Sequence, residues 1–280
     1  MSNFSKSFVA KAQVAKLWYK HDSFSEIFEH ILIQTNNICT RQCKACYYWM
    51  KDPEYIPEKL SDEAVYNILN QLSEIDYSGR IGLFDINEPL TDQRIFSFVS
   101  YAAKKIKKAW KMIITNGDLL DRSMLKKLID AWIDQISVSI YDDETYLKML
   151  ELKDSTNVLE RIHFELMDFR NEIFTDNRGG NIDHIKYNDL YVSSSCERIY
   201  KIIVVKSSWN VVSCFGDFFQ KNVMGSIYES KLVDIWFWDR FHELRKNLDA
   251  WKRWRYNLCR RCNYPGSWGF FKKPQVSLKK

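Results

Sequence analysis

Three closely spaced cysteines are the strongest sign of chemistry in this sequence. Cys39, Cys43 and Cys46 form a CxxxCxxC pattern just after a short apolar run. A cubane of four irons held by only three thiolates leaves one iron open to a small-molecule ligand, whereas a fourth thiolate closes it. A zinc finger instead draws its ligands from two separated pairs. The spacing therefore predicts an iron–sulfur cluster with an open iron, which indicates catalysis.

Four more cysteines lie in the last third of the chain, in separated segments. Such a set can enclose a second cubane or a zinc ion. Because the seven cysteines are an odd number and no export signal precedes them, a disulfide framework is a poor explanation. We expect a second iron–sulfur cluster rather than structural zinc, since the set contains no histidine. Its expected ligands are Cys196, Cys214, Cys259 and Cys262.

The elements that would position these cysteines are strand–helix units. Between residues 31 and 169, short apolar runs alternate with helical patterns, which predicts an α/β fold around a parallel sheet. Ser61 is expected to cap a helix after the first strand, and further helices are expected over 119–133 and after Asp142. Loops at the carboxyl ends of parallel strands converge on one rim, so the first cysteine loop should lie there. The expected strands span residues 31–34, 81–86, 112–115, 136–140 and 163–167.

The first cysteine pattern, in this position, resembles the signature of the radical S-adenosylmethionine (SAM) superfamily. The resemblance implies a partial (β/α) TIM-like barrel whose first [4Fe-4S] cluster binds SAM. Asn87 and Glu88 end the second strand, where the family has a Gly-Gly-Glu-Pro-like motif for the methionine amino group. Ala45 replaces the family's usual aromatic residue, so Tyr47 is expected to supply that surface. The residues implied to bind the cofactor are Tyr47, Asn87, Glu88, Asn116, Ser137 and Ser139.

The C-terminal region resembles the SPASM and twitch domains of the same superfamily. The resemblance rests on residues 214–217, 223–227 and the CRRC sequence at 259–262. It implies a small α+β domain with an auxiliary [4Fe-4S] cluster, and the lack of cysteines after CRRC matches the twitch form with one such cluster. A long helix is expected over 231–248. The implied domains are an N-terminal extension at 1–30, the partial barrel at 31–190 and the auxiliary-cluster domain at 191–280.

Residues 177–180, Asn-Arg-Gly-Gly, resemble a motif of dehydrogenases that oxidise aminocyclitols in antibiotic biosynthesis. This resemblance implies that a 5′-deoxyadenosyl radical takes a hydrogen atom from a sugar or aminocyclitol. An alcohol carbon would become a ketone, with the auxiliary cluster as electron acceptor and a flavodoxin or ferredoxin as electron donor. Arg178 is the implied catalytic residue, and because a guanidinium stays protonated we expect it to orient substrate and stabilise charge. A solvated surface turn is the alternative for this segment.

Two other functions are open at this point. Many twitch and SPASM enzymes epimerise or crosslink ribosomally made peptides, although residues 1–30 leave little room for a leader-binding domain. The sequence WKRWRY at 251–256 interleaves cations and aromatics, as proteins that bind single-stranded nucleic acid do. The spacing of Trp251 and Trp254 also fits a helix stripe that faces the core.

The composition is that of a globular protein, with 46% hydrophobic and 28% charged residues. No apolar run is long enough to cross a bilayer and the first residues lack the pattern of a secretion signal, so we expect a cytoplasmic protein without membrane contact. Residues 240–280 hold twelve Lys or Arg against two acidic residues, in a chain of net charge +5. Such a basic end suits an anionic substrate, a nucleic acid or an acidic redox partner, or offsets a thiolate-bound cluster.

Overall fold

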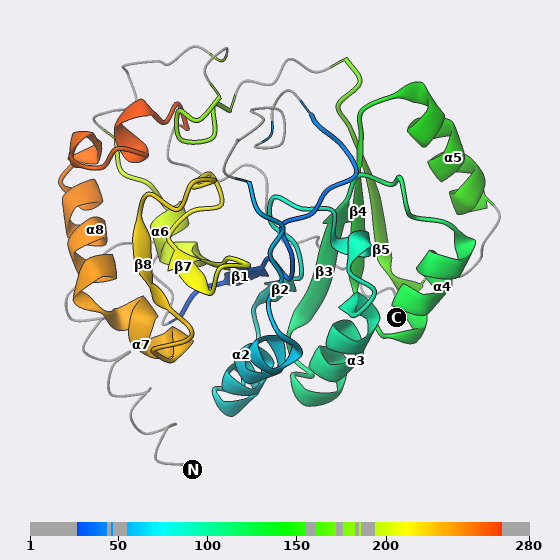
Figure 1. Ribbon diagram of the computed structural model, residues 1–280, viewed down its shortest axis with the longest axis horizontal. Coiled ribbons are helices and arrows are strands. Elements are labelled where there is room, and N and C mark those ends of the chain that lie inside the picture. The colour runs from blue at the N-terminus through cyan, green and yellow to red at the C-terminus, as the bar shows by residue number, and fades with distance from the viewer. Residues whose placement is uncertain are drawn as a thin grey trace, which may run out of the picture.

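The protein, a computed structural model, is described over residues 27–43, 46, 55–154, 161–171, 176–182, 185 and 194–264. Its described strands form one sheet in the order β5-β4-β3-β2-β1-β6-β7-β8, with helices along its outer side (Figure 1). The strands are β1 His30–Ile33, β2 Arg80–Gly82, β3 Trp110–Thr115, β4 Gln135–Ile140, β5 His163–Asp168, β6 Ile202–Val205, β7 Asn210–Val212 and β8 Val223–Ser226. The helices and 3-10 turns are α2 Asp62–Glu74, η2 Pro89–Thr91, α3 Ile95–Lys105, α4 Arg122–Asp130, α5 Asp143–Asp154, α6 Arg198–Lys201, α7 Leu232–Phe237, α8 Asp239–Asp249, η5 Arg253–Arg255 and η6 Cys259–Arg261.

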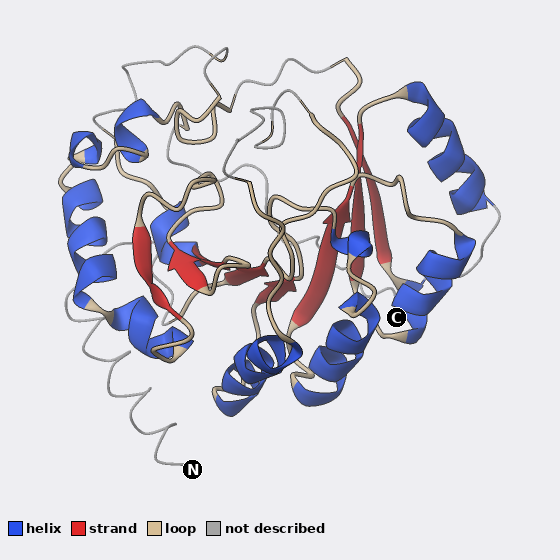
Figure 2. Ribbon diagram, viewed as in Figure 1, coloured by secondary structure: helices blue, strands red, loops and turns tan. Residues whose placement is uncertain are grey.

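The sheet is parallel through its first six strands. All neighbours from β5 to β6 pair in parallel, and β6, β7 and β8 then pair antiparallel. The sheet curves around an interior and does not close, while the helices stay outside it (Figure 2). The predicted α/β fold with a partial barrel is confirmed. Because the parallel strands share one direction, the loops after β1 to β5 meet at one rim.

The strands bury side chains on both faces of the sheet. In β1, Ile31 and Ile33 belong to the large apolar core between sheet and helices. Leu32 lies on the opposite face, where it packs with Met112 and Val204 inside the barrel. Successive strand residues alternate in this way. The two cores hold the strands, and so fix where their carboxyl ends lie.

The expected helices form with shifted boundaries. α2 begins as predicted, since Ser61 Oγ accepts a hydrogen bond from the N–H of Ala64 at 3.1 Å. The helix expected over 119–133 is the 9-residue α4, because Asp121 caps it and the chain before Asp121 forms a turn. α3 was not expected from the sequence, because Arg94 before it provides no side-chain cap that marks its start.

The single helix expected over 231–248 is in fact two helices, α7 and α8. Trp238 stands between them with φ −67° and ψ 159°, an extended conformation that ends one helix and starts the next. The apolar spacing continues across this break, since Trp236 and Phe241 pack together at 5.1 Å between ring centroids. A periodic pattern therefore did not reveal the bend.

The core-facing interpretation of residues 251–256 is wrong. Trp251 and Trp254 are 63% and 58% exposed, whereas Arg253 between them is 1% exposed. Trp251 has a φ of 59° and follows the end of α8, and Arg253 then starts η5. Because the segment crosses a helix end, helical spacing does not apply to it.

The C-terminal region continues the sheet of the barrel. β6 pairs in parallel with β1, with Ile203 opposite Ile31. The predicted domain boundary near residue 190 lies outside the described residues, as do residues 1–26 of the predicted extension. None of the helices in the described ranges combines the length and the apolar character needed to cross a membrane.

Candidate active site

The first cysteine loop follows β1. Cys39, Cys43 and Cys46 are half-buried, and the N–H of Cys46 donates to the carbonyl of Cys43 at 3.0 Å. Cys39 Sγ accepts from the N–H of Arg41 at 3.5 Å. Burial raises the pKa of the Cys39 thiol to about 12 and that of Cys43 to about 11, and the neighbouring thiols add to both. Iron takes thiolates as ligands, so these thiols lose their protons when a cluster binds.

Arg41 fixes this loop against the loops after β3 and β4. Its guanidinium donates to Asp118 from Nε at 2.8 Å, to Asp142 at 2.6 Å and to Thr145 Oγ1 at 2.7 Å. Partial burial raises the pKa of Asp118, but hydrogen bonds from Arg41 and Thr40 lower it below its usual value. The sequence did not single out Arg41, because its partners lie 77 to 104 residues away and share no periodic pattern with it.

Asn87 and Glu88 lie beside the first cysteine loop, just before η2. Asn87 Nδ2 donates to Asn36 Oδ1 at 3.2 Å, close behind β1. Glu88 is 1% exposed, and its carboxylate accepts from Thr115 Oγ1 at 2.7 Å and from the N–H of Asn116 at 2.8 Å. Burial raises the pKa of Glu88 despite these donors. Both residues therefore join the loop after β2 to neighbouring strand ends.

Asn116 approaches the first cysteine loop from the end of β3. Its Nδ2 atom lies 3.8 Å from Cys39 Sγ and donates to Thr40 Oγ1 at 2.9 Å. Its Oδ1 atom accepts from the N–H of Asp118 at 3.0 Å. A donor beside a ligating sulfur orients that ligand and tunes the cluster. Asn116 is thus placed to support the first cluster.

Ser139, near the end of β4, also belongs to this rim. It hydrogen-bonds Tyr141, whose pKa burial raises to about 12 with a further contribution from Cys43. The guanidinium carbon of Arg41, in the first cysteine loop, lies 5.8 Å from the ring centroid of Tyr141. Tyr47, the other residue predicted to flank the cofactor, lies outside the described residues.

Ser137 lies deeper in the barrel than Ser139, two residues closer to the start of β4. Its hydroxyl donates to Glu165 Oε2 at 3.0 Å and accepts from Gln135 Nε2 at 2.9 Å. Its hydrogen bonds are thus made within the barrel, and the structure gives it no contact with the cysteine loop among the described residues.

The second cysteine set gathers segments near α6, after β7 and in η6. Its thiols are half-buried. Cys214 Sγ accepts from the N–H of Gly216 at 3.3 Å, and Cys262 Sγ accepts from the N–H of Tyr264 at 3.4 Å. Burial raises the pKa of all four thiols, and the other thiols of the set add to it. Grouped thiols with N–H donors fit an iron–sulfur cluster. The set is Cys196, Cys214, Cys259 and Cys262.

Residues 177–180 form a turn that packs on the CRRC segment. Asn177 donates through Nδ2 to the Arg261 carbonyl at 2.6 Å, and its Oδ1 atom accepts from the N–H of Asn263 at 3.1 Å. Gly180 has a φ of 75°, and a Cβ atom there would lie 2.3 Å from the Cβ atom of Arg261. Only glycine fits this contact. The turn is therefore not on the surface, since Asn177, Gly179 and Gly180 are buried against the CRRC segment, although Arg178 itself is half-buried.

Arg178 extends from this turn toward Phe215. Its backbone has a φ of 49°, and its guanidinium carbon lies 5.5 Å from the ring centroid of Phe215, next to the second set. Its charge also offsets part of the rise that burial causes in the pKa of Tyr141, next to the first set, and of Asp85. The charge of Arg178 thus reaches Tyr141 after β4, and its guanidinium lies over Phe215, which follows Cys214 in the chain.

A buried ion pair joins the two regions. Asp85, after β2, pairs through Oδ2 with Lys206 Nζ, after β6, and both side chains are 1% exposed. Burial raises the pKa of Asp85, although Lys206 acts to lower it. The sequence gave no signal for this pair, because its members are 121 residues apart.

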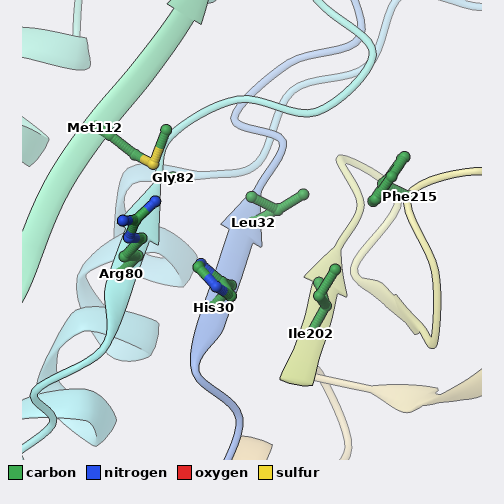
Figure 3. A pocket seen from close by; sticks show the side chains of 7 residues that line it. All are labelled: His30, Leu32, Arg80, Gly82, Met112, Ile202 and Phe215. Carbon is green, nitrogen blue, oxygen red and sulfur yellow. The ribbon is translucent and has the colours of Figure 1, made fainter. Parts of the chain in front are cut away.

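A small cavity inside the barrel lies away from the rim (Figure 3). Its volume is about 10 Å³, the lower limit for one water molecule. Most of its lining comes from residues within β1, β2, β3 and β6, before the loops at the ends of these strands. The barrel is thus filled below the rim, and the chemistry belongs to the loops at the strand ends. The lining residues are His30, Leu32, Arg80, Gly82, Met112, Ile202 and Phe215.

The chain matches two family models. The model described as the radical SAM superfamily matches residues 33–168, and the SPASM model of an iron–sulfur cluster-binding domain matches residues 196–263. The first match contains the CxxxCxxC loop, and the second contains all four later cysteines.

Relatives cover most of the chain. The S-adenosyl-L-methionine-dependent 2-deoxy-scyllo-inosamine dehydrogenase of Niallia circulans is 31% identical over 239 residues, which are 85% of this chain and 94% of that protein. The crystal structure of BtrN in complex with AdoMet and 2-DOIA has a TM-score of 0.75 at 30% identity, over 85% of this chain and 94% of that one. Native anSMEcpe with bound AdoMet and Cp18Cys peptide has a TM-score of 0.54 at 14% identity, over 83% and 87%, and shares the fold.

Proposed function

The chain belongs to the radical SAM superfamily, and we propose that it oxidises an alcohol carbon of a sugar or aminocyclitol to a ketone. Its cofactors are SAM and iron–sulfur clusters. When bound, they supply a 5′-deoxyadenosyl radical that takes a hydrogen atom from the substrate carbon, and an acceptor for one substrate electron. Loss of the hydroxyl proton to water completes the two-electron oxidation. The observation that carries the proposal is the position of Arg178, whose guanidinium lies over Phe215 next to Cys214 and whose charge reaches Tyr141 near the first cysteine loop.

Arg178 is the proposed catalytic residue. Among the described residues, none accepts a hydrogen bond from its guanidinium, which leaves its donors for a substrate oxygen. A guanidinium stays protonated, so Arg178 stabilises negative charge as the hydroxyl proton leaves and does not take that proton itself. Asn181 holds the turn, since its Nδ2 atom donates to the carbonyls of Arg178 at 2.8 Å and Gly216 at 2.7 Å. The backbone that carries the cation is thereby fixed before substrate binds.

SAM is proposed to contact Asn87, Asn116 and Ser139, which surround the first cysteine loop. The Glu88 carboxylate accepts three hydrogen bonds within the chain, and a carboxylate has lone pairs beyond these for the methionine amino group. Ser137 and Tyr47 stay predictions for this site. Since Glu88 is buried, a contact from it requires the cofactor to reach the rim between β2 and β3.

A small polyol substrate has better support than a peptide. The dehydrogenase relative is similar over nearly its whole length, whereas the peptide-bound structure shares the fold alone. The first electron is proposed to come from a reduced flavodoxin or ferredoxin. The basic segment 240–280 offers such an acidic partner a complementary charge.

The proposal is tested by anaerobic turnover of the reconstituted enzyme with reductant and SAM. Aminocyclitols, neutral sugars and short peptides are compared by the 5′-deoxyadenosine and the ketone that they yield. We expect an aminocyclitol or sugar to give both products in equal amounts, with deuterium on the oxidised carbon recovered in 5′-deoxyadenosine. Arg178→Gln should lower ketone formation by a factor of about 100 or more. Formation of 5′-deoxyadenosine that peptides alone accelerate would contradict the proposal.

A further inference from the structure

Arg198 is a buried cation beside the second cysteine set. It starts α6, two residues after Cys196, and is 7% exposed. Its guanidinium carbon lies 3.4 Å from the ring centroid of Tyr264 and 4.4 Å from that of Phe215. Its Nε atom is buried and has no hydrogen-bond acceptor in the described part of the chain. The cation is therefore held by two aromatic rings rather than by a full set of acceptors.

The two rings belong to the segments that carry cluster ligands. Tyr264 donates its N–H to Cys262 Sγ at 3.4 Å, and Phe215 follows Cys214 directly in the chain. The charge of Arg198 consequently acts on the sulfurs of three ligands of the set. Those ligands are Cys196, Cys214 and Cys262.

Few charges oppose this cation. The Asp176 carboxylate lies 3.4 Å from Arg198 Nη2, a long contact, and its side chain is 32% exposed. The half-buried Asp176 carboxylate is partly open to water, which screens its charge more than that of the buried guanidinium. Arg253 is a second buried cation nearby, but its nitrogens donate to the carbonyls of Ser194, Ser195 and Tyr264. The charge of Arg253 acts on Cys196 and Cys259. Arg198 differs because its charge also acts on Cys214 and Cys262.

We propose that Arg198 raises the reduction potential of the cluster bound by the second cysteine set. A cluster gains one negative charge when it takes an electron, and a fixed cation in a dry environment stabilises this reduced form more than the oxidised form. For the role of the cluster as an electron acceptor, the inference rests on the proposed function. In the proposed oxidation, one electron passes from the substrate carbon to the cluster, while the hydroxyl proton passes to water. Arg198 thus acts on the reaction through the cluster and does not itself contact the substrate.

The test is a potentiometric titration of the fully reconstituted chain, followed by electron paramagnetic resonance without substrate. Addition of SAM identifies the signal of the first cluster, so the remaining signal reports on the second. We expect Arg198→Gln to shift the ratio of reduced to oxidised second cluster at least tenfold toward the oxidised form. For one electron, that shift is about 59 mV.

Two matched variants distinguish the effect of the Arg198 charge from the effect of its packing and from that of any cation near the cluster. Arg198→Lys keeps the charge and should retain most of the potential. Arg260→Gln removes an exposed cation next to Cys259, and should leave the potential close to that of the unchanged protein because water screens it. An Arg198→Gln potential no lower than that of Arg260→Gln would overturn the proposal, as would an equal drop in Arg198→Lys.

Iron content and circular dichroism establish that each variant is folded and loaded. If Arg198→Gln does not hold the second cluster, Arg198→Met carries the same expectation, because a thioether can occupy the space between two rings. Loss of the cluster from both variants would contradict the proposal, because Arg198 would then be needed to hold the cluster rather than to set its reduction potential. Since no substrate is used, a failed dehydrogenase assay and a failed potential shift are separate results.

Discussion

The two cysteine sets differ in how the chain holds them. The first set comes from one loop, and Arg41 fixes that loop to residues after β3 and β4. The second set comes from separated segments, and residues 177–181 pack between them. A loop can lose its cluster while the sheet stays intact, whereas the second set is part of the packing of its region. The first set thus belongs to a single loop, and the second set depends on the packing of several segments.

The largest stability effect is expected where the two regions meet, at Asp85 and Lys206. Lys206→Met leaves a buried carboxylate without its partner, which should lower the free energy of unfolding by about 3–5 kcal/mol at pH 7. Chemical denaturation measures this effect. Lys108→Met is the matched control, since its pair with Asp76 is 63% and 73% exposed and should contribute about 0–1 kcal/mol.

The same variant should show a defined pH dependence. Burial raises the folded-state pKa of Asp85, and loss of Lys206 removes a cause that lowers it. A carboxyl group whose folded pKa exceeds its unfolded value adds stability below the unfolded pKa, and this is lost as pH rises through the folded pKa. The loss in the free energy of unfolding that Lys206→Met causes should therefore become smaller as pH falls from 7 toward 4. Asp85→Asn in the same chain should remove this pH dependence. An equal defect at all pH values would mean that Asp85 is not the cause.

The turn at 177–180 should be the most sensitive backbone site of the second set. In Gly180→Ala the new Cβ atom would overlap Arg261, in a left-handed backbone conformation. We expect a loss of about 2–4 kcal/mol in stability together with loss of the second cluster. Gly216→Ala is the control, because its Cβ atom would meet the nearest atom at 3.3 Å and its φ is not positive. Similar iron loss in both variants would count against a specific role for the turn.

Arg41→Gln should affect the first set alone. The variant loses the guanidinium that bridges Asp118 and Asp142, so the loop should hold its cluster less well. We expect up to about four irons to be lost, with the thermal unfolding midpoint nearly unchanged. Iron content and calorimetry on the same sample measure both effects. A large fall in the midpoint would show that the first loop is as interlocked as the second set.

Asn116→Ala should give the smallest effect. It removes one amide donor at 3.8 Å from Cys39 Sγ and leaves every cluster ligand in place. At a fixed potential, the ratio of reduced to oxidised first cluster should change by less than tenfold, and that of the second cluster should not change. A shift in the reduction potential of the second cluster would show that the two cysteine sets are not independent.

The sequence predicted the features that have a local signal. Ser61 marked the start of α2, apolar runs marked β1 to β5, and cysteine spacing separated two cluster sites. These signals are short, because a cap, a strand or a CxxC sequence spans only a few residues. The turn at 177–180 was also found, whereas its packing against Arg261 depends on a contact that no local pattern predicts.

The features that were missed depend on contacts across the chain. Arg41 and the pair of Asp85 and Lys206 are ordinary charged residues until the sheet brings them together. The break at Trp238 and the exposure of Trp251 escaped because an apolar period continues through a bend or a helix end. Long-range pairing, rather than local propensity, decides such cases.

The central claim, two separate clusters with different surroundings, is tested most directly by iron counting. After anaerobic reconstitution the intact chain should hold about eight irons, and a chain with Cys39, Cys43 and Cys46 all changed to Ala should hold about four. That variant should unfold at nearly the same temperature and release no 5′-deoxyadenosine from SAM. Fewer than about four irons in the intact chain, or no difference between the two proteins, would contradict the account.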